Sequence, residues 1–139
     1  MIAMATLIAL FAMALLLGGM VFFSAVVAPL VFTRLPVEHA GRFIRALFPF
    51  YYLFVLVSAT LGTCALAWVD PTAAVVLAAV ALITLWLRQG LMVRINRLSD
   101  ALRAGETAAR RGFDRAHRLS VLINMAQLLA AGWCLARLG

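Results

Sequence analysis

Four apolar runs, each long enough to cross a bilayer, take up most of this sequence and require it to fold as a membrane protein. The first run extends from Ile2 to Phe32 without a charged residue. A helix crosses the hydrocarbon core with about 20 apolar residues, so four such helices need about 80 residues. The chain has 139 residues, of which 66% are hydrophobic and only 12% charged. These values exclude a soluble globule, a disordered chain and a small disulfide scaffold.

We therefore predict one all-α domain over residues 1–139, a four-helix membrane bundle with spans at about 4–32, 50–69, 72–93 and 114–138. The third helix is expected to extend to about residue 104, because Gly105 suits the position just after a helix. Residues 37–48 are amphipathic with helical period, and Pro49 follows them. This pattern predicts a short interfacial helix that ends at Pro49. Pro29 is expected to kink the end of the first span.

The arginines are distributed unevenly, and this predicts the topology. All twelve basic residues are Arg, and eleven of them lie in or beside the loops that follow the first and third spans. The positive-inside rule then places residues 33–49 and 94–113 in the cytoplasm and both termini in the periplasm of a bacterial inner membrane. The run from Ile2 to Phe32 is too long for a cleaved signal peptide and is expected to remain as a span.

A polar stripe follows one face of the fourth predicted span. His117, Ser120, Asn124 and Gln127 are spaced three, four and three residues apart, which places them within about 80° on a helix. Unpaired polar groups are costly in hydrocarbon, so the stripe should face the bundle. It either ties helices together or lines a polar pocket, and Arg88, near the end of the third span, either snorkels to the interface or joins that pocket.

The basic face is a second candidate site, with Arg42 and Arg45 on the amphipathic segment and Arg97 and Arg103 on the extension of the third span. Arginines beside a membrane attract anionic lipid headgroups, and they also suit a protein partner. We expect the lipid bilayer and anionic lipids as partners, with a membrane protein or a second copy of the chain as further candidates. Nucleic acid is not expected, since the basic loop holds almost no aromatic residues.

Metal and cofactor sites have little support in this sequence, and we predict no cofactor. His39 and His117 are candidate ligands for haem or a transition metal, and Cys64 and Cys134 for copper. No CxxC, HxxxH or HExxH spacing supports either alternative. No catalytic constellation is present, and no carboxylate lies inside a span as in many proton-coupled transporters. A membrane enzyme or transporter is therefore the third hypothesis.

Three stretches give the chain a resemblance to a known family. They are Gly18-Gly19 with Phe22-Phe23 and Ala28-Pro29; Leu35-Pro36 with Ala40-Gly41 and the run Leu47-Phe48-Pro49-Phe50-Tyr51-Tyr52; and Phe113 with His117, Ser120 and Asn124, preceded by Arg94-Ile95-Asn96. With these motifs the chain resembles the transmembrane-protein-205-like family, small four-span domains of unknown function, although Arg94 stands where a proline would be expected. The resemblance implies a four-helix membrane domain and supplies no activity.

Our leading functional hypothesis is a non-enzymatic integral membrane protein that binds a protein partner or anionic lipid through its basic face. The alternative is the binding of a small molecule, haem or metal in the bundle core.

Overall fold

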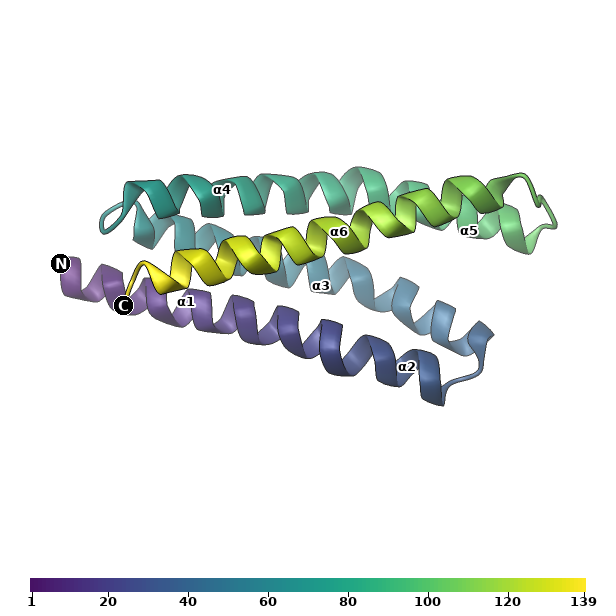
Figure 1. The fold of residues 1–139 in the computed structure, drawn as a ribbon, viewed down its shortest axis with the longest axis horizontal. Helices are drawn as coiled ribbons and strands as arrows, with labels where there is room; N and C mark the ends of the chain where they lie inside the picture. Colours follow the sequence, from purple (N-terminus) through teal and green to yellow (C-terminus); the bar gives the residue numbers. More distant parts are fainter.

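The computed structural model describes residues 1–139 and contains only helices (Figure 1). Four continuous helical rods run through the chain, and each is long and apolar enough to cross a membrane. The four-span prediction is thereby confirmed. The elements are α1 (Ile2–Phe22), a π-helical turn η1 (Phe23–Val27), α2 (Ala28–Arg34), α3 (Val37–Leu66), α4 (Pro71–Trp86), a second π turn η2 (Leu87–Leu91), α5 (Met92–Arg103) and α6 (Ala109–Ala136).

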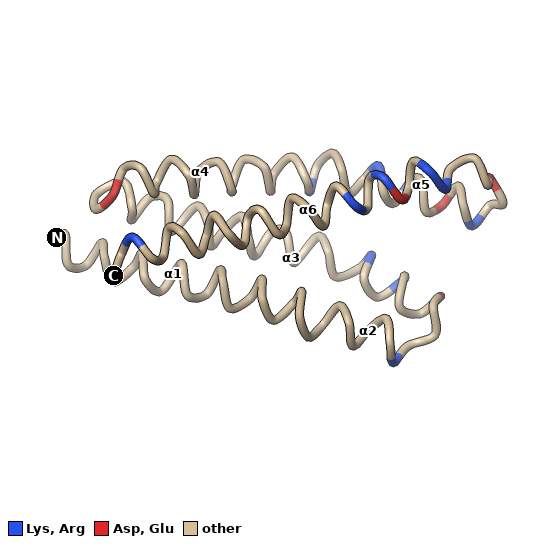
Figure 2. The backbone as a smooth tube through the Cα atoms, viewed as in Figure 1, with Lys and Arg blue, Asp and Glu red and all other residues tan.

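The rods pack as a ring in which each one touches two neighbours. Helix α1 packs against α3 and α6, and α4 packs against the same two helices from the other side. Both termini lie at one end of the bundle, together with the turn between α3 and α4 (Figure 1). We call this the termini end. The other end carries the α2–α3 turn, the α5–α6 loop and most of the charged residues, and we call it the basic end (Figure 2).

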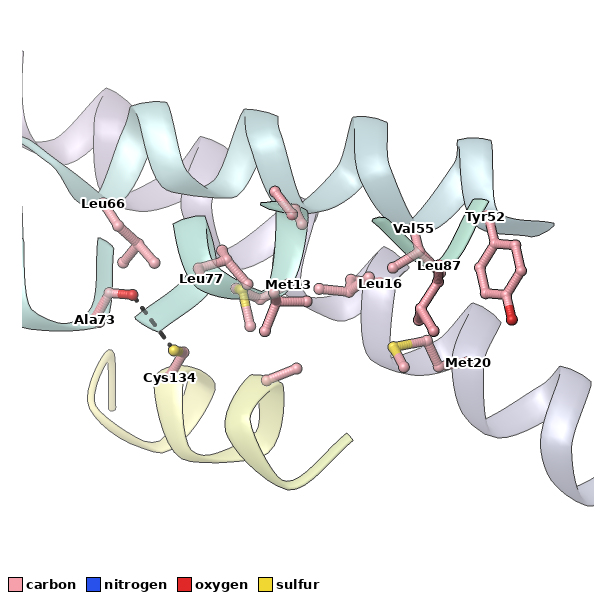
Figure 3. Close-up of a cluster of buried hydrophobic side chains, with 14 of the residues drawn as sticks. Met13, Leu16, Met20, Tyr52, Val55, Leu66, Ala73, Leu77, Leu87 and Cys134 are labelled. Atoms are coloured by element: carbon pink, nitrogen blue, oxygen red, sulfur yellow. Dashed lines mark hydrogen bonds between the residues drawn. The ribbon is translucent and has the colours of Figure 1, made fainter. Parts of the chain in front are cut away.

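Long flexible side chains of α1 fill the centre of the bundle at the termini end. Met13, Leu16 and Met20 are fully buried, and Figure 3 shows them facing Leu77 and Leu87 of the opposite rod. Helix α3 approaches closely at Gly62, where a methyl group would lie 2.6 Å from Leu77 Cδ2. Small residues at such points allow close helix packing, which is the main source of association where lipid removes the hydrophobic driving force.

Pro49 does not end a helix, which corrects the prediction of a separate interfacial helix over 37–48. Helix α3 runs through Pro49 without interruption from Val37 to Leu66. The reason is that the buried face keeps its helical phase across the proline, with Ala40 and Ile44 before it and Tyr51 and Tyr52 after it. Neighbouring helices make proline tolerable inside a membrane helix, because they satisfy backbone groups that it leaves free. The carbonyl oxygen that loses its helical donor is that of Arg45, four residues before the proline. Arg88 Nε donates at 3.2 Å to the carbonyl oxygen of Pro49 itself, which joins η2 to α3 at this level.

The other helix boundaries follow the sequence more closely. Gly105 adopts a positive φ of 90° directly after α5, as expected for a glycine that terminates a helix. Helix α6 begins at Ala109, about one turn earlier than predicted, so its first turns project with α5 beyond the apolar part of the rods. Its start carries Arg110 and Arg111, whose polarity had suggested a loop.

Two π turns interrupt the helical rods, η1 between α1 and α2 and η2 between α4 and α5. In η1, the Ala28 N–H donates to the Phe23 carbonyl oxygen, just before Pro29. Proline lacks an N–H and clashes with the carbonyl four residues earlier, and a wider turn relieves both problems. The structure therefore has a π turn where the sequence predicted a kink. The second turn, η2, contains Arg88 and Gly90. Its extra residue changes which side chains of α5 face the bundle.

Candidate functional site: a cavity between two hairpins

A cavity of about 420 Å³ opens at the basic end of the bundle, between the α2–α3 hairpin and the α5–α6 hairpin. The two hairpins do not pack closely against each other, although α1, α3, α4 and α6 are in close contact towards the termini end. Figure 1 shows α2 and α6 diverging in this direction. The polar side chains that line the cavity are Ser24, Arg45, Tyr51, Tyr52, Asn96, Ser99, Arg103, His117, Ser120 and Asn124.

A hydrogen-bond relay closes the inner end of the cavity. The Tyr51 hydroxyl donates to Asn124 Oδ1 at 2.7 Å, and Asn124 Nδ2 donates to Ser24 Oγ at 3.0 Å. The three residues belong to α3, α6 and η1, so the relay joins three of the four rods. Because each group in the relay has a partner, this end of the cavity is polar but satisfied.

Aromatic rings form the wall beside this relay. Phe23 stacks on Tyr51 with ring centroids 4.2 Å apart, and Phe48 meets Tyr52 at 5.4 Å and Phe23 at 5.5 Å. Three of these rings come from the first two turns on either side of Pro49. The continuous helix through Pro49 is therefore what aligns them on one wall.

Two arginines cross the tip of the cavity in opposite directions. Arg45 of α3 reaches Asp100 of α5 in a two-pronged ion pair, with Nη2 3.1 Å from Oδ2. Arg103 of α5 reaches back to α3, where its Nη2 lies 3.4 Å from the place a side chain at Gly41 would occupy. Gly41 thus leaves space for the guanidinium of Arg103. Arg103 itself forms no ion pair.

The predicted polar stripe of α6 is divided between two environments. Asn124, Ser120 and His117 line the cavity. Gln127 lies deeper, with 4% of its surface exposed, and donates to Thr84 Oγ1 at 2.9 Å and to the Val80 carbonyl oxygen at 3.2 Å. The stripe therefore ties helices together at Gln127 and lines a cavity above it. His117 is exposed and stacks with Phe113, and the Ser120 hydroxyl donates to the His117 carbonyl oxygen.

The remaining predicted residues lie outside the cavity. Arg88 is partly buried, and its side chain bonds the α3 backbone at Pro49 instead of joining His117. Arg42 pairs with Glu38 on the exposed face of α3, and Arg97 is exposed on α5. Of the four arginines of the predicted basic face, only Arg45 and Arg103 line the cavity.

The candidate metal ligands are dispersed. His39 and Cys64 are exposed on α3, whereas Cys134 is buried in the core, where its thiol donates to the Ala73 carbonyl oxygen (Figure 3). No group of three or more His, Cys, Asp and Glu side chains in the chain is arranged to hold a metal ion.

Sequence reasoning missed several residues of the cavity. Ser24 was not among the predicted site residues, and its hydroxyl is part of the relay. Asn96 and Ser99 were assigned no role and line the wall of α5. The polar face of α5 could have indicated these two residues, because it lies on the side of the polar stripe of α6. The π turn at η2 shifts the helical register of α5, so the sequence pattern alone does not show which way this face points.

At the termini end, one acidic residue connects the α3–α4 turn to the end of α6. Asp70 caps α4 by accepting from the backbone N–H groups of Thr72 and Ala73, and its Oδ2 lies 2.6 Å from Arg137 Nε. The hydrogen bond from Arg137 is the main cause that lowers the pKa of the Asp70 carboxyl below its ordinary value. Arg137 also lies over the Trp133 ring.

Taken together, these helices define an integral membrane four-helix bundle with a cavity at its charged end. The chain belongs to the family described as a domain of unknown function, DUF4149, whose sequence model matches residues 11–104. The match covers α1 from Phe11 onwards and extends to the end of α5. This family fits the predicted small membrane domain. It is not the transmembrane-protein-205-like family that the motifs had suggested. No curated protein and no solved structure matches the chain.

Proposed function

We propose that this protein binds anionic lipid headgroups at one face of the membrane through the basic end of its bundle. The observation that carries the proposal is an excess of unpaired arginines at this end. Only three of the twelve arginines form ion pairs, and one of those three, Arg137, is at the termini end. The nine unpaired arginines all lie on the side of the basic end (Figure 2).

The spacing of the charges fits a bilayer. From Asp70 to Arg88 the third rod rises about 27 Å, and from Arg118 to Arg137 the fourth rises about 28 Å, at 1.5 Å per residue. Both lengths are close to the thickness of a hydrocarbon core, about 30 Å. The arginines beyond Arg88 and Arg118 would then lie at the level of the headgroups of one leaflet.

The start of α6 supplies the densest group of cations. Arg110, Arg111, Arg115 and Arg118 surround an open depression together with Asp114. Each arginine close to an anionic membrane surface contributes about 1 kcal/mol of attraction. The excess of cations in the two loops also supports an orientation in which the basic end is cytoplasmic and both termini are periplasmic, in a bacterial inner membrane.

The proposal is tested with spin-labelled lipids in proteoliposomes of phosphatidylcholine. We expect spin-labelled phosphatidylglycerol to be immobilised at the protein several-fold more than spin-labelled phosphatidylcholine, and the preference to fall as salt rises, because salt screens exposed charges. Replacing the four arginines of the α6 start with glutamine should remove most of the preference. Arg137→Gln, at the opposite end, is the control and should leave it unchanged. If neither salt nor the fourfold substitution changes the preference for phosphatidylglycerol, the proposal is contradicted, and a protein partner for these arginines is favoured.

A further inference from the structure

We propose that the cavity between the two hairpins takes up one anionic amphiphile from the bilayer, a lipid with a phosphate-type headgroup and an apolar chain. This inference rests on the proposed function and adds to it a single site of defined stoichiometry. It is carried by three features of the cavity: the free donors at its tip, its apolar walls, and its open side towards the membrane.

The tip and middle of the cavity offer hydrogen-bond donors and the positive charge of Arg103, which forms no ion pair. Arg103, Asn96, Ser99 and His117 have no side-chain hydrogen-bond partner in the chain, whereas the charge of Arg45 is already paired with Asp100. No Asp or Glu lines the cavity, since Asp100 pairs with Arg45 outside it. A phosphate, with several acceptor oxygens and negative charge, complements this set, because guanidinium groups bind phosphate through parallel N–H donors.

The walls below these donors are apolar and too long for a headgroup alone. Along α3 the cavity extends from Gly41 to Tyr52, about 16 Å at 1.5 Å per residue. Aromatic rings line this length on one side, with Ile44 between them and the tip. The volume of about 420 Å³ lies in the range of small-molecule sites, about 300–1,000 Å³. An inorganic phosphate would leave most of this surface uncovered, whereas a hydrocarbon chain would cover it.

The open side of the cavity faces the membrane between α2 and α6. Its rim is formed by Ala28 and Phe32 on α2 and by Val121 and Met125 on α6. Phe32, Val121 and Met125 are about half exposed, and the two helices do not pack closely against each other here. An apolar rim allows a lipid chain to move sideways from the bilayer into the cavity without passing through water. The headgroup then stays at the level of Arg103 while the chain lies against the aromatic wall.

The first measurement is native mass spectrometry of the detergent-solubilised protein with 1-palmitoyl lysophosphatidic acid. We expect one added lipid per chain, with saturation. 1-Palmitoylglycerol, which has the same chain and no phosphate, and glycerol 3-phosphate, which has the head without the chain, should each bind about tenfold more weakly or worse, because each lacks one of the two contacts. Equal binding of glycerol 3-phosphate would show an anion site without a chain site and would overturn the inference.

Two matched pairs of variants locate the lipid. Val121→Trp fills the rim, whereas Leu122→Trp adds the same bulk at the next residue, which is 60% exposed and does not line the cavity. We expect Val121→Trp to weaken binding of the lysophosphatidic acid at least tenfold and Leu122→Trp to leave it unchanged. Arg103→Gln should weaken it by about tenfold, the usual loss of a charge-assisted hydrogen bond, whereas Arg97→Gln on the same helix should not.

The outcomes separate this inference from the proposed function. Val121→Trp leaves every arginine in place, so the spin-label preference for phosphatidylglycerol should persist in it. If Val121→Trp and Arg103→Gln bind one lysophosphatidic acid as the wild type does, the cavity is overturned while the surface proposal stands. If the spin-label preference is absent from the wild type, the surface proposal fails whatever the adducts show. Melting curves and circular dichroism identify a misfolded variant, and Met125→Trp then replaces Val121→Trp at the same rim.

Discussion

Replacing Gln127 with leucine measures the stability that a buried polar residue contributes to this bundle. The substitution removes two interhelical hydrogen bonds, to Thr84 Oγ1 at 2.9 Å and to the Val80 carbonyl oxygen at 3.2 Å. Interhelical hydrogen bonds in membranes average about 0.6 kcal/mol each, with a maximum of about 1.7 kcal/mol. The expected loss is near the average, because neither acceptor is left alone: the Thr84 hydroxyl itself donates to the Val80 carbonyl at 2.8 Å. Leucine also has a similar volume, so no cavity forms. We therefore expect a loss of about 1 kcal/mol in the free energy of unfolding.

The assay is equilibrium unfolding in mixed micelles of a mild detergent and sodium dodecyl sulfate, followed by circular dichroism. A double-mutant cycle with Thr84→Val should give a coupling energy of about 0.6 kcal/mol between the two side chains. Thr60→Val is the control, because the Thr60 hydroxyl bonds only the backbone of its own helix, at Leu56. A loss above about 3.4 kcal/mol would exceed two bonds at their maximum, and zero coupling would show that the two side chains do not interact.

Two further substitutions test the packing and the charge at the termini end. Gly62→Ala should be less stable than Gly132→Ala by about 1–3 kcal/mol. Both variants gain helix propensity, but only the methyl group at position 62 must displace Leu77. Equal melting temperatures of the two variants would contradict the close approach of α3 and α4. For Asp70, the ion pair with Arg137 lowers the carboxyl pKa, so its stabilisation is complete above the unfolded pKa, about 3.9, and is lost as the pH falls through the lower folded value. The difference in melting temperature between the wild type and Asp70→Asn should therefore shrink below about pH 4, and a difference that grows in acid would refute this assignment.

The sequence predicted the helices well because the signals involved are local. Apolar length set the four rods, and Gly105 marked the end of α5 as expected. Pro49 was misjudged, because the cost of a proline in a helix depends on whether other groups satisfy the backbone. Helix α3 also contacts residues that are distant in sequence at this point, since Arg88, 39 residues away, donates to the Pro49 carbonyl oxygen.

The candidate site could be predicted only in part for a similar reason. Helical phase correctly places Asn124 and Gln127 on the side of α6 that faces the bundle, but phase does not say which rod each of them meets. Asn124 meets α3 and η1, whereas Gln127 meets α4. The separation of the hairpins is a property of the assembled bundle, and no short motif encodes it. The π turn at η2 adds a second obstacle, since it changes the phase of α5 after Arg88.

The separation of the two hairpins also has a mechanical consequence. The termini end of the bundle is held firmly, because the core packs densely there and Asp70 connects the α3–α4 turn to α6. At the basic end, the α2–α3 and α5–α6 hairpins are joined across the cavity mainly by the Arg45–Asp100 pair and by the side chain of Arg103, which extends to Gly41. Polar side chains that long can extend or fold back far more easily than a close-packed core can deform. The basic end is therefore the part of the protein that deforms most easily. A small rotation of one hairpin about the termini end produces its largest displacement at the basic end.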